Sequence, residues 1–92
     1  MFERFGSRWA LQVLFALHER GILRFSELMR AVPGAISERM LTSTVRDLEQ
    51  AGLVARRVYP EVPPRVEYSL TPKGRSVIPI LTQLRDWAEK NA

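Results

Sequence analysis

The stretch of sequence that decides the fold is ISERMLTSTVRDLEQAGLVARRVYPEVPPRVEYSL, residues 36–70. Its first half predicts an α-helix. Ser37 is a preferred N-cap residue, and Ile36 before it can pack against Leu41 at the fourth helical position. Gly52 then supplies the residue type that most often ends a helix. We therefore expect a helix that begins just after Ser37 and stops at Gly52.

The second half of this stretch predicts a β-hairpin. Residues 53–59 and 66–70 are rich in β-branched and aromatic residues, and the second run alternates, with Val66, Tyr68 and Leu70 on one face. The loop between the runs contains three prolines and no glycine, so we expect a stiff, protruding loop rather than a tight turn. The alternation does not decide whether Arg56 or Arg57 points outward.

Three further helices are expected outside this stretch. Residues 8–20 contain a run over 9–17 that is apolar except for Gln12, and they precede a glycine, which is typical of a central buried helix. A short apolar run over 22–25, possible as a strand, leads to Ser26 as the N-cap of a two-turn helix that Pro33-Gly34 ends. The last helix begins at Thr71-Pro72 and carries an apolar stripe, and Pro79 inside it should produce a kink.

These elements predict a mainly α protein with a small β-hairpin, which is a winged helix-turn-helix of the α+β class. A chain of 92 residues suits one hydrophobic core, so we expect a single domain over residues 1–92. Within it the helix-turn-helix occupies about 26–51, the wing about 53–71 and the C-terminal helix about 72–91.

The helix after Ser37 predicts a surface that reads DNA. At about 100° per residue, its polar side chains gather opposite the apolar ones. They can reach base edges or phosphates, and they are Arg39, Thr42, Ser43, Arg46 and Gln50. An ordinary solvated helix face would look much the same. The preceding short helix and the following hairpin favour a recognition helix in the major groove.

Arginines outside that helix are expected to add contacts to the DNA backbone. Arg65 lies beside the tip of the wing and is expected to reach the backbone or the minor groove. The helix N-terminus capped by Ser26 can hold a phosphate, with Arg24 adjacent. Arg56 is taken as a further DNA contact.

Composition excludes several other classes of function. The formal charge of +4 is spread evenly along the chain and is weak evidence by itself. No apolar run could span a membrane and no secretory signal is recognisable, so we expect a cytoplasmic protein. One histidine, no cysteine and no glycine-rich phosphate loop leave no nucleophile and base, so we expect no enzyme, no metal and no cofactor. A winged-helix module for protein–protein contacts, without sequence-specific DNA binding, is the alternative function.

Several blocks of the sequence resemble successive parts of the HxlR-type transcription regulators, which are more distantly similar to MarR-type proteins. The blocks are GSRWAL at 6–11, LRFSEL at 23–28, ISERMLT at 36–42, LEQAGLV at 48–54 and YPEVPPRVEYSLT at 59–71. The last block is the most specific. The resemblance covers about residues 2–90.

This resemblance implies a bacterial or archaeal regulator that binds double-stranded DNA at an inverted-repeat operator as a homodimer. It implies that the recognition helix presents Ser37, Arg39, Thr42, Ser43 and Arg46, and that Arg65 lies on the wing. It also implies dimer contacts in the first and last helices, from Phe2, Phe5, Ile78, Leu81, Leu84 and Trp87. Many family members carry a cysteine in an earlier leader, which some use for thiol sensing, but this sequence has no cysteine. The sequence shows no obvious effector pocket. A hydrophobic gap between the DNA-binding part and the dimer helices would leave room for a small-molecule effector, but the residues identify no ligand.

Overall fold

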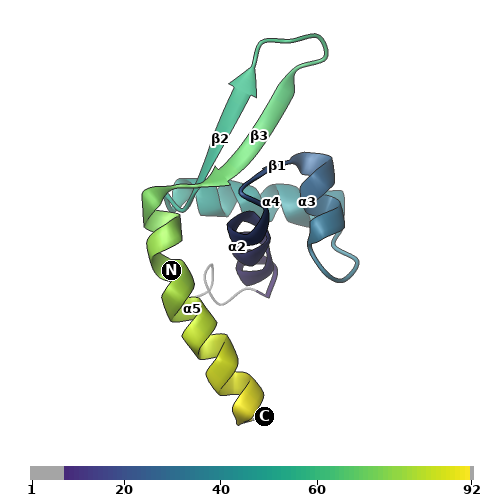
Figure 1. The fold of residues 1–92 in the computed structure, drawn as a ribbon. Helices are drawn as coiled ribbons and strands as arrows, with labels where there is room; N and C mark the ends of the chain where they lie inside the picture. The colour runs from purple at the N-terminus through teal and green to yellow at the C-terminus, as the bar shows by residue number, and fades with distance from the viewer. Residues whose placement is uncertain (1–7, 92) are drawn as a thin grey trace.

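The computed structural model describes residues 8–91, and the fold is the expected winged helix-turn-helix (Figure 1). In chain order the elements are α2 (Arg8–Arg20), β1 (Ile22–Arg24), α3 (Phe25–Ala31), α4 (Glu38–Gln50), β2 (Val54–Tyr59), β3 (Arg65–Leu70) and α5 (Pro72–Lys90). No helix among these residues is long and apolar enough to cross a membrane.

The three strands form one antiparallel sheet in the order β1-β3-β2. In the hairpin, Val54 pairs with Leu70 and Tyr59 pairs with Arg65, so the loop at the tip comprises residues 60–64. The hairpin extends away from the helices, in the direction opposite to the C-terminal end of α5 (Figure 1). The protruding hairpin was correctly predicted.

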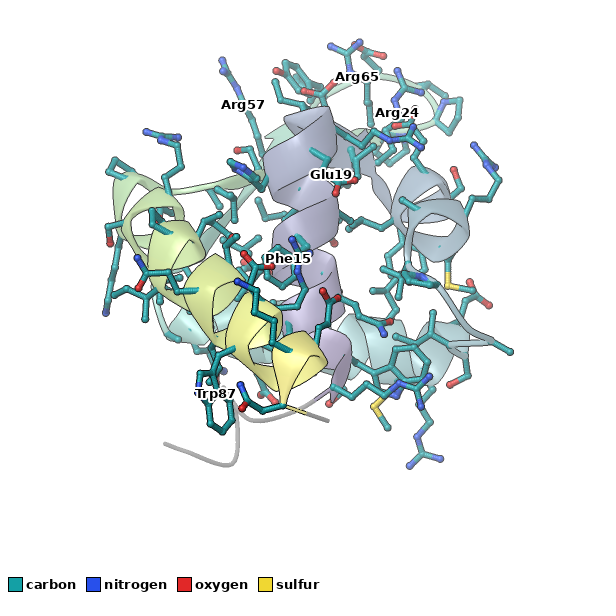
Figure 2. All side chains as sticks on the ribbon, turned by 60° about the horizontal axis from the view of Figure 1, so that its bottom comes forward. Phe15, Glu19, Arg24, Arg57, Arg65 and Trp87 are labelled. Atoms are coloured by element: carbon teal, nitrogen blue, oxygen red, sulfur yellow. The ribbon has the colours of Figure 1, made fainter. Side chains whose placement is uncertain are left out.

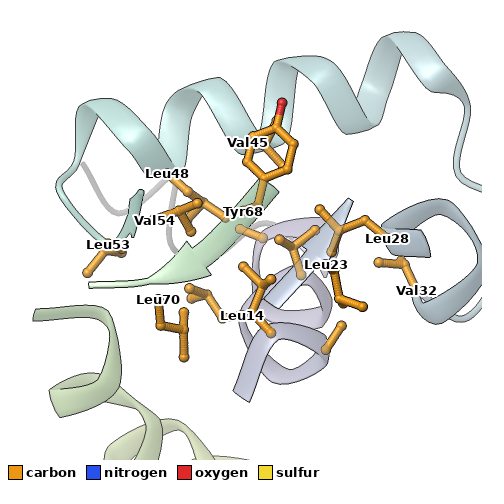
Figure 3. Close-up of a cluster of buried hydrophobic side chains, with 14 of the residues drawn as sticks. Leu14, Leu23, Leu28, Val32, Val45, Leu48, Leu53, Val54, Tyr68 and Leu70 are labelled. Atoms are coloured by element: carbon orange, nitrogen blue, oxygen red, sulfur yellow. The ribbon is translucent and has the colours of Figure 1, made fainter. Parts of the chain in front are cut away.

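One cluster of buried side chains joins all of these elements (Figure 3). The central helix α2 contributes Leu14 and Leu17, which are almost fully buried. From the sheet, Tyr68 and Leu70 project into the cluster, as the alternation in β3 predicts. The burial of these apolar side chains is the main force that holds the hairpin base against the helices.

The helix α4 forms as its local sequence dictates. The Ser37 hydroxyl oxygen accepts a hydrogen bond from the Met40 amide at 3.1 Å, which confirms the N-cap. Leu41, Val45 and Leu48 are buried along its inner side. The chain leaves α4 through Gly52, whose φ of 78° is a conformation that residues with a Cβ rarely adopt.

The predicted cap of the preceding helix is wrong. Ser26 lies inside α3, and the N-cap residue is Arg24. The Glu27 carboxylate accepts a hydrogen bond from the Arg24 amide at 2.8 Å. Glutamate three residues after the N-cap therefore satisfies the helix end, as in one half of a capping box. This removes the need for a hydroxyl at the N-cap.

The start of α5 is fastened to the end of α4. The Thr71 hydroxyl oxygen accepts from the Gly74 amide at 3.0 Å and donates to the Gly52 carbonyl oxygen at 2.5 Å. The Lys73 ammonium group donates to the Ala51 carbonyl oxygen at 3.0 Å. Helix α5 then continues through Pro79 as one element of 19 residues. These bonds fix how α5 leaves the helix-turn-helix.

Candidate nucleic-acid interface

The polar row predicted on α4 lies on its solvent side. All five side chains are exposed, and they are Arg39, Thr42, Ser43, Arg46 and Gln50. The opposite side of the helix is buried in the core. The row therefore presents two guanidinium groups, two hydroxyls and an amide to any molecule that approaches α4.

Hydrogen bonds inside α4 already use some of the hydroxyl groups. The Thr42 hydroxyl donates to the Glu38 carbonyl oxygen at 2.8 Å, so only its oxygen lone pairs and its methyl group face outward. The Ser37 hydroxyl oxygen is occupied in the N-cap. Ser43 makes no side-chain hydrogen bond to any of residues 8–91. The Ser43 hydroxyl is thus free both to donate and to accept, and the Ser37 hydroxyl, which only accepts in the N-cap, keeps its own proton to donate.

The sheet register shows which of the two adjacent arginines lies beside α4. Arg56 pairs with Tyr68, and paired residues in an antiparallel sheet point to the same side. Tyr68 points toward α4 (Figure 3), so Arg56 does too. The Arg56 Nε atom lies 3.9 Å from a carboxylate oxygen of Glu49 on α4. Arg57 pairs with Glu67 on the opposite face of the hairpin.

A polar hollow lies between α4 and the wing, on the side of the hairpin that carries Arg56. It has a volume of about 300 Å³ and is lined by Thr42, Val45, Arg46, Glu49, Gln50, Arg56 and Tyr68. Burial raises the pKa of the Tyr68 phenol above its usual value of 10.0, with a smaller opposing effect from the Arg56 charge. Tyr68 therefore lines the hollow as a neutral phenol. The hollow joins the polar row of α4 to the base of the wing in one surface.

Arg65 does not reach outward from the wing as the sequence suggested. Its guanidinium group lies 4.0 Å from the centroid of the Tyr59 ring and forms ion pairs with Glu61 at 3.2 Å and Glu67 at 3.7 Å. Only 30% of the side chain is exposed. It folds back onto its own hairpin because two carboxylates and an aromatic face surround it there.

The second expected phosphate site, at the start of α3, also differs from expectation. Arg24 and Ser26 are exposed and line a shallow hollow of about 440 Å³ beside the wing loop. Ser26 does not cap the helix, and the Glu27 carboxylate occupies the helix end instead. A phosphate at this helix end would meet that negative charge. Arg24 alone retains a side chain suited to a backbone contact.

The residues expected in a dimer contact divide into buried and exposed sets. Ile78 is 3% exposed and belongs to the core of the chain itself, so its expected role in a dimer contact is wrong. Leu81 is half-buried and packs against that core. Leu84 and Trp87 are 57% and 63% exposed, and Ile80, which we did not predict, is 64% exposed. Phe2 and Phe5 lie outside the described residues.

A larger, mostly apolar groove runs between α2 and α5. It has a volume of about 680 Å³, and its lining includes Leu11, Phe15, Leu81 and Leu84. The Arg85 guanidinium group lies over the Phe15 ring, 4.5 Å from its centroid. In Figure 2, Phe15 lies on α2 beside α5, whereas Trp87 lies on the outer side of α5. The groove is an apolar gap beside the last helix.

Comparison with known proteins agrees with this geometry. The family model described as HxlR-like helix-turn-helix matches residues 4–92. An HTH-type transcriptional regulator of Methanothermobacter thermautotrophicus is 57% identical over 84 residues, which cover 91% of this chain and 63% of that protein. The chain therefore spans just under two thirds of that relative's length.

Solved structures with the same fold are also regulators. A MarR-family transcriptional regulator from Porphyromonas gingivalis W83 has a TM-score of 0.84 and 44% identity, covering 99% of this chain and 87% of that one. The reduced form of the transcriptional regulator YodB from B. subtilis has a TM-score of 0.84 and 35% identity, covering 97% and 85%.

These relatives are transcriptional regulators and not enzymes, which confirms the prediction that the chain is no enzyme. The family model and the relatives also confirm the resemblance found in the sequence. The chain belongs to the HxlR-like helix-turn-helix family of DNA-binding transcription regulators.

Proposed function

We propose that this chain binds an inverted-repeat operator in double-stranded DNA as a homodimer. In this proposal α4 enters the major groove, and the wing follows the adjacent backbone or minor groove. The observation that carries the proposal is the exposed polar row of α4 and its continuity with Arg56 across the hollow. Action on genomic DNA would put the protein in the cytoplasm.

Within this surface we assign different roles to different side chains. Arg46 lies in the middle of the row and at the edge of the hollow, so it is the best placed for a base edge. Ser43 lies about one turn before it on α4 and Arg39 about two turns before it. Arg56 faces the same side, and its side chain is 50% exposed with only one carboxylate of residues 8–91 near it, that of Glu49 at 3.9 Å, so its charge remains accessible to a phosphate. Base contacts give specificity, whereas phosphate contacts give affinity and its salt dependence.

The homodimer is supported by the apolar side chains on α5. Ile80, Leu84 and Trp87 are each more than half exposed, and they recur at intervals of four and three residues on one helix. Residues at this spacing lie on one side of a helix. Exposed apolar patches of this kind commonly mark protein contacts. We propose that this row packs against a second copy of the chain.

No sulfur chemistry is part of the proposal. The 92 residues contain no cysteine, so any signal that acts on this sequence acts by another route than a thiol. The groove between α2 and α5 shares Leu84 with the exposed row of α5. A ligand or a partner seated there would contact both helices.

The test is selection of binding sites from a random duplex pool, followed by titration of the selected DNA. Arg46→Ala should weaken binding by about five- to a hundredfold and relax the preference at one base position. Arg56→Ala should weaken binding to all duplexes and lower the slope of log affinity against log salt by about 0.9. Lys90→Ala is the matched control, because it removes the same charge at the far end of α5 (Figure 1).

The result that would contradict the proposal is equally direct. If selection enriches no sequence and affinity does not depend on salt, the chain is a module for protein–protein contacts instead. If Arg46→Ala changes affinity no more than Lys90→Ala does, α4 is not the recognition helix.

A further inference from the structure

The wing contains a compact cluster that the proposed DNA contacts do not use, and it is centred on Tyr59. Tyr59 and Arg65 form the last strand pair before the loop at the wing tip. Two guanidinium groups lie on the Tyr59 ring, that of Arg65 at 4.0 Å and that of Arg57 at 5.1 Å from the centroid. Figure 2 shows Arg57 and Arg65 at the same end of the molecule.

The contacts of Arg65 all come from its own hairpin. The ring comes from β2, Glu61 from the loop and Glu67 from β3. Its Nε atom is buried and has no hydrogen-bond partner within the described part of the chain. One guanidinium group thus holds together three segments, namely β2, the loop and β3. Arg57 is different, because it is exposed and no carboxylate of residues 8–91 forms an ion pair with it.

The local charge argues against a phosphate contact by Arg65. Glu61 and Glu67 carry two negative charges against its one positive charge. A DNA phosphate at this position would be repelled unless a carboxylate moved away. DNA binding depends on salt because protein cations that neutralise phosphates release the counterions bound there. The charge of Arg65 is already balanced by carboxylates of the protein, so Arg65 should release few counterions.

We propose that Arg65 is a positioning residue, which braces the wing tip through Tyr59, Glu61 and Glu67 and acts on DNA only by fixing the shape of the wing. This inference rests on the proposed DNA-binding function. It replaces the direct backbone or minor-groove contact that the sequence suggested for Arg65. A braced wing loses less conformational freedom on binding than a loose one, so removal of the brace weakens binding without removing a contact.

The experiment compares Arg65→Ala, Tyr59→Leu and the double variant with wild type. The first measurement is binding to a random-sequence duplex over a series of salt concentrations. Arg65→Ala should lower affinity by roughly three- to tenfold at every salt concentration, giving a line parallel to that of wild type. Tyr59→Leu should do the same, and the double variant should be no weaker than either single variant, because each removes the same brace.

The second measurement is amide hydrogen exchange over residues 58–66 without DNA. Exchange should become about tenfold faster in Arg65→Ala and in Tyr59→Leu, since the wing tip opens more often. Arg57→Ala is the matched control, because it removes an arginine from the same ring but no ion pair. It should leave the exchange of these amides at the wild-type rate.

Three outcomes would overturn the proposal. A salt slope lowered by about 0.9 in Arg65→Ala would identify a direct phosphate contact. Unchanged amide hydrogen exchange over residues 58–66 in Arg65→Ala would show that Arg65 does not stabilise the wing tip. Unchanged DNA affinity in Arg65→Ala would show that the brace does not contribute to DNA binding. If wild type itself binds no duplex, the proposed function fails, while the exchange experiment still tests the brace.

Discussion

The hydroxyl group of Thr71 offers the sharpest test of how α5 is joined to the end of α4. Its oxygen accepts a hydrogen bond from the Gly74 amide and so caps α5. The same hydroxyl donates to the Gly52 carbonyl oxygen, just beyond the end of α4. Thr71→Ala removes both bonds at once and leaves the Gly74 amide, which is part-buried, without its partner.

The expected loss follows from the two bonds. An N-cap hydroxyl contributes about 1 kcal/mol, and a further hydrogen bond contributes about another 1 kcal/mol. Thr71→Ala should therefore lower the free energy of unfolding by about 2 kcal/mol. For a domain of this size, that is a fall in melting temperature of roughly 8–16 °C. The assay is urea unfolding followed by circular dichroism, at one fixed protein concentration because self-association would change the midpoint.

Thr71→Ser is the control, since it keeps the hydroxyl group and removes only a methyl group. It should lie within about 0.5 kcal/mol of wild type. If the alanine variant is also within that range, the two hydrogen bonds contribute nothing net and our reasoning is refuted. If serine is as unstable as alanine, the methyl group rather than the hydroxyl joins the two helices.

Three further predictions concern the core, the hollow and α5. Gly74→Ala should lower the free energy of unfolding by about 1–3 kcal/mol in the same urea assay, because the added methyl group would overlap the carbonyl oxygen of Leu53. This loss is expected although alanine is the better helix former, and a variant as stable as wild type, or more stable, would contradict it. Burial raises the pKa of Tyr68 above 10.0, so the unfolded chain ionises first, and the stability present below pH 10 should fall as the pH rises above it. Tyr68→Phe should reduce that fall, and an identical pH profile would argue against it. Leu84→Glu should give a monomer by light scattering, whereas Gln83→Glu, which adds the same charge at an exposed neighbour, should leave the dimer intact; a dimer in both variants would place the contact elsewhere.

Elements that depend on neighbouring residues were predictable from the sequence. The cap at Ser37 and the stop at Gly52 need only side chains and backbone within one turn, and both are found in the structure. The exception is the start of α3. There the usual preference for a hydroxyl at the N-cap pointed to Ser26, but Glu27 reaches back to the chain and allows Arg24 in that position.

The orientation of the wing arginines depends on strand register, which the alternation in one strand does not give. A five-residue loop over 60–64 places Arg56 opposite Tyr68. Counting back from that loop would have put Arg56 on the side of the buried tyrosine. Arg65 could not be assigned this way, because its position depends on carboxylates in two other segments of the hairpin.

The apolar stripe of α5 gave a similar ambiguity. Residues three and four apart share one side of a helix, whether that side packs in the core or against another molecule. Ile78 belongs to the first class and Leu84 to the second. The stripe alone could not separate them, because the point at which α5 leaves the core depends on its attachment to α4 and the sheet.

The contacts around Tyr59 have a consequence for how this hairpin can change. Arg57, Glu61, Arg65 and Glu67 all belong to residues 54–70, so every partner in the cluster is inherited together. Exchange of the whole hairpin between related regulators should keep the tip intact, whereas replacement of Arg65 alone would leave two adjacent carboxylates uncompensated. The hairpin can thus be replaced as a whole. Helix α4, in contrast, is bonded at its end to Thr71 and Lys73 at the start of α5, so it cannot be replaced without regard to α5.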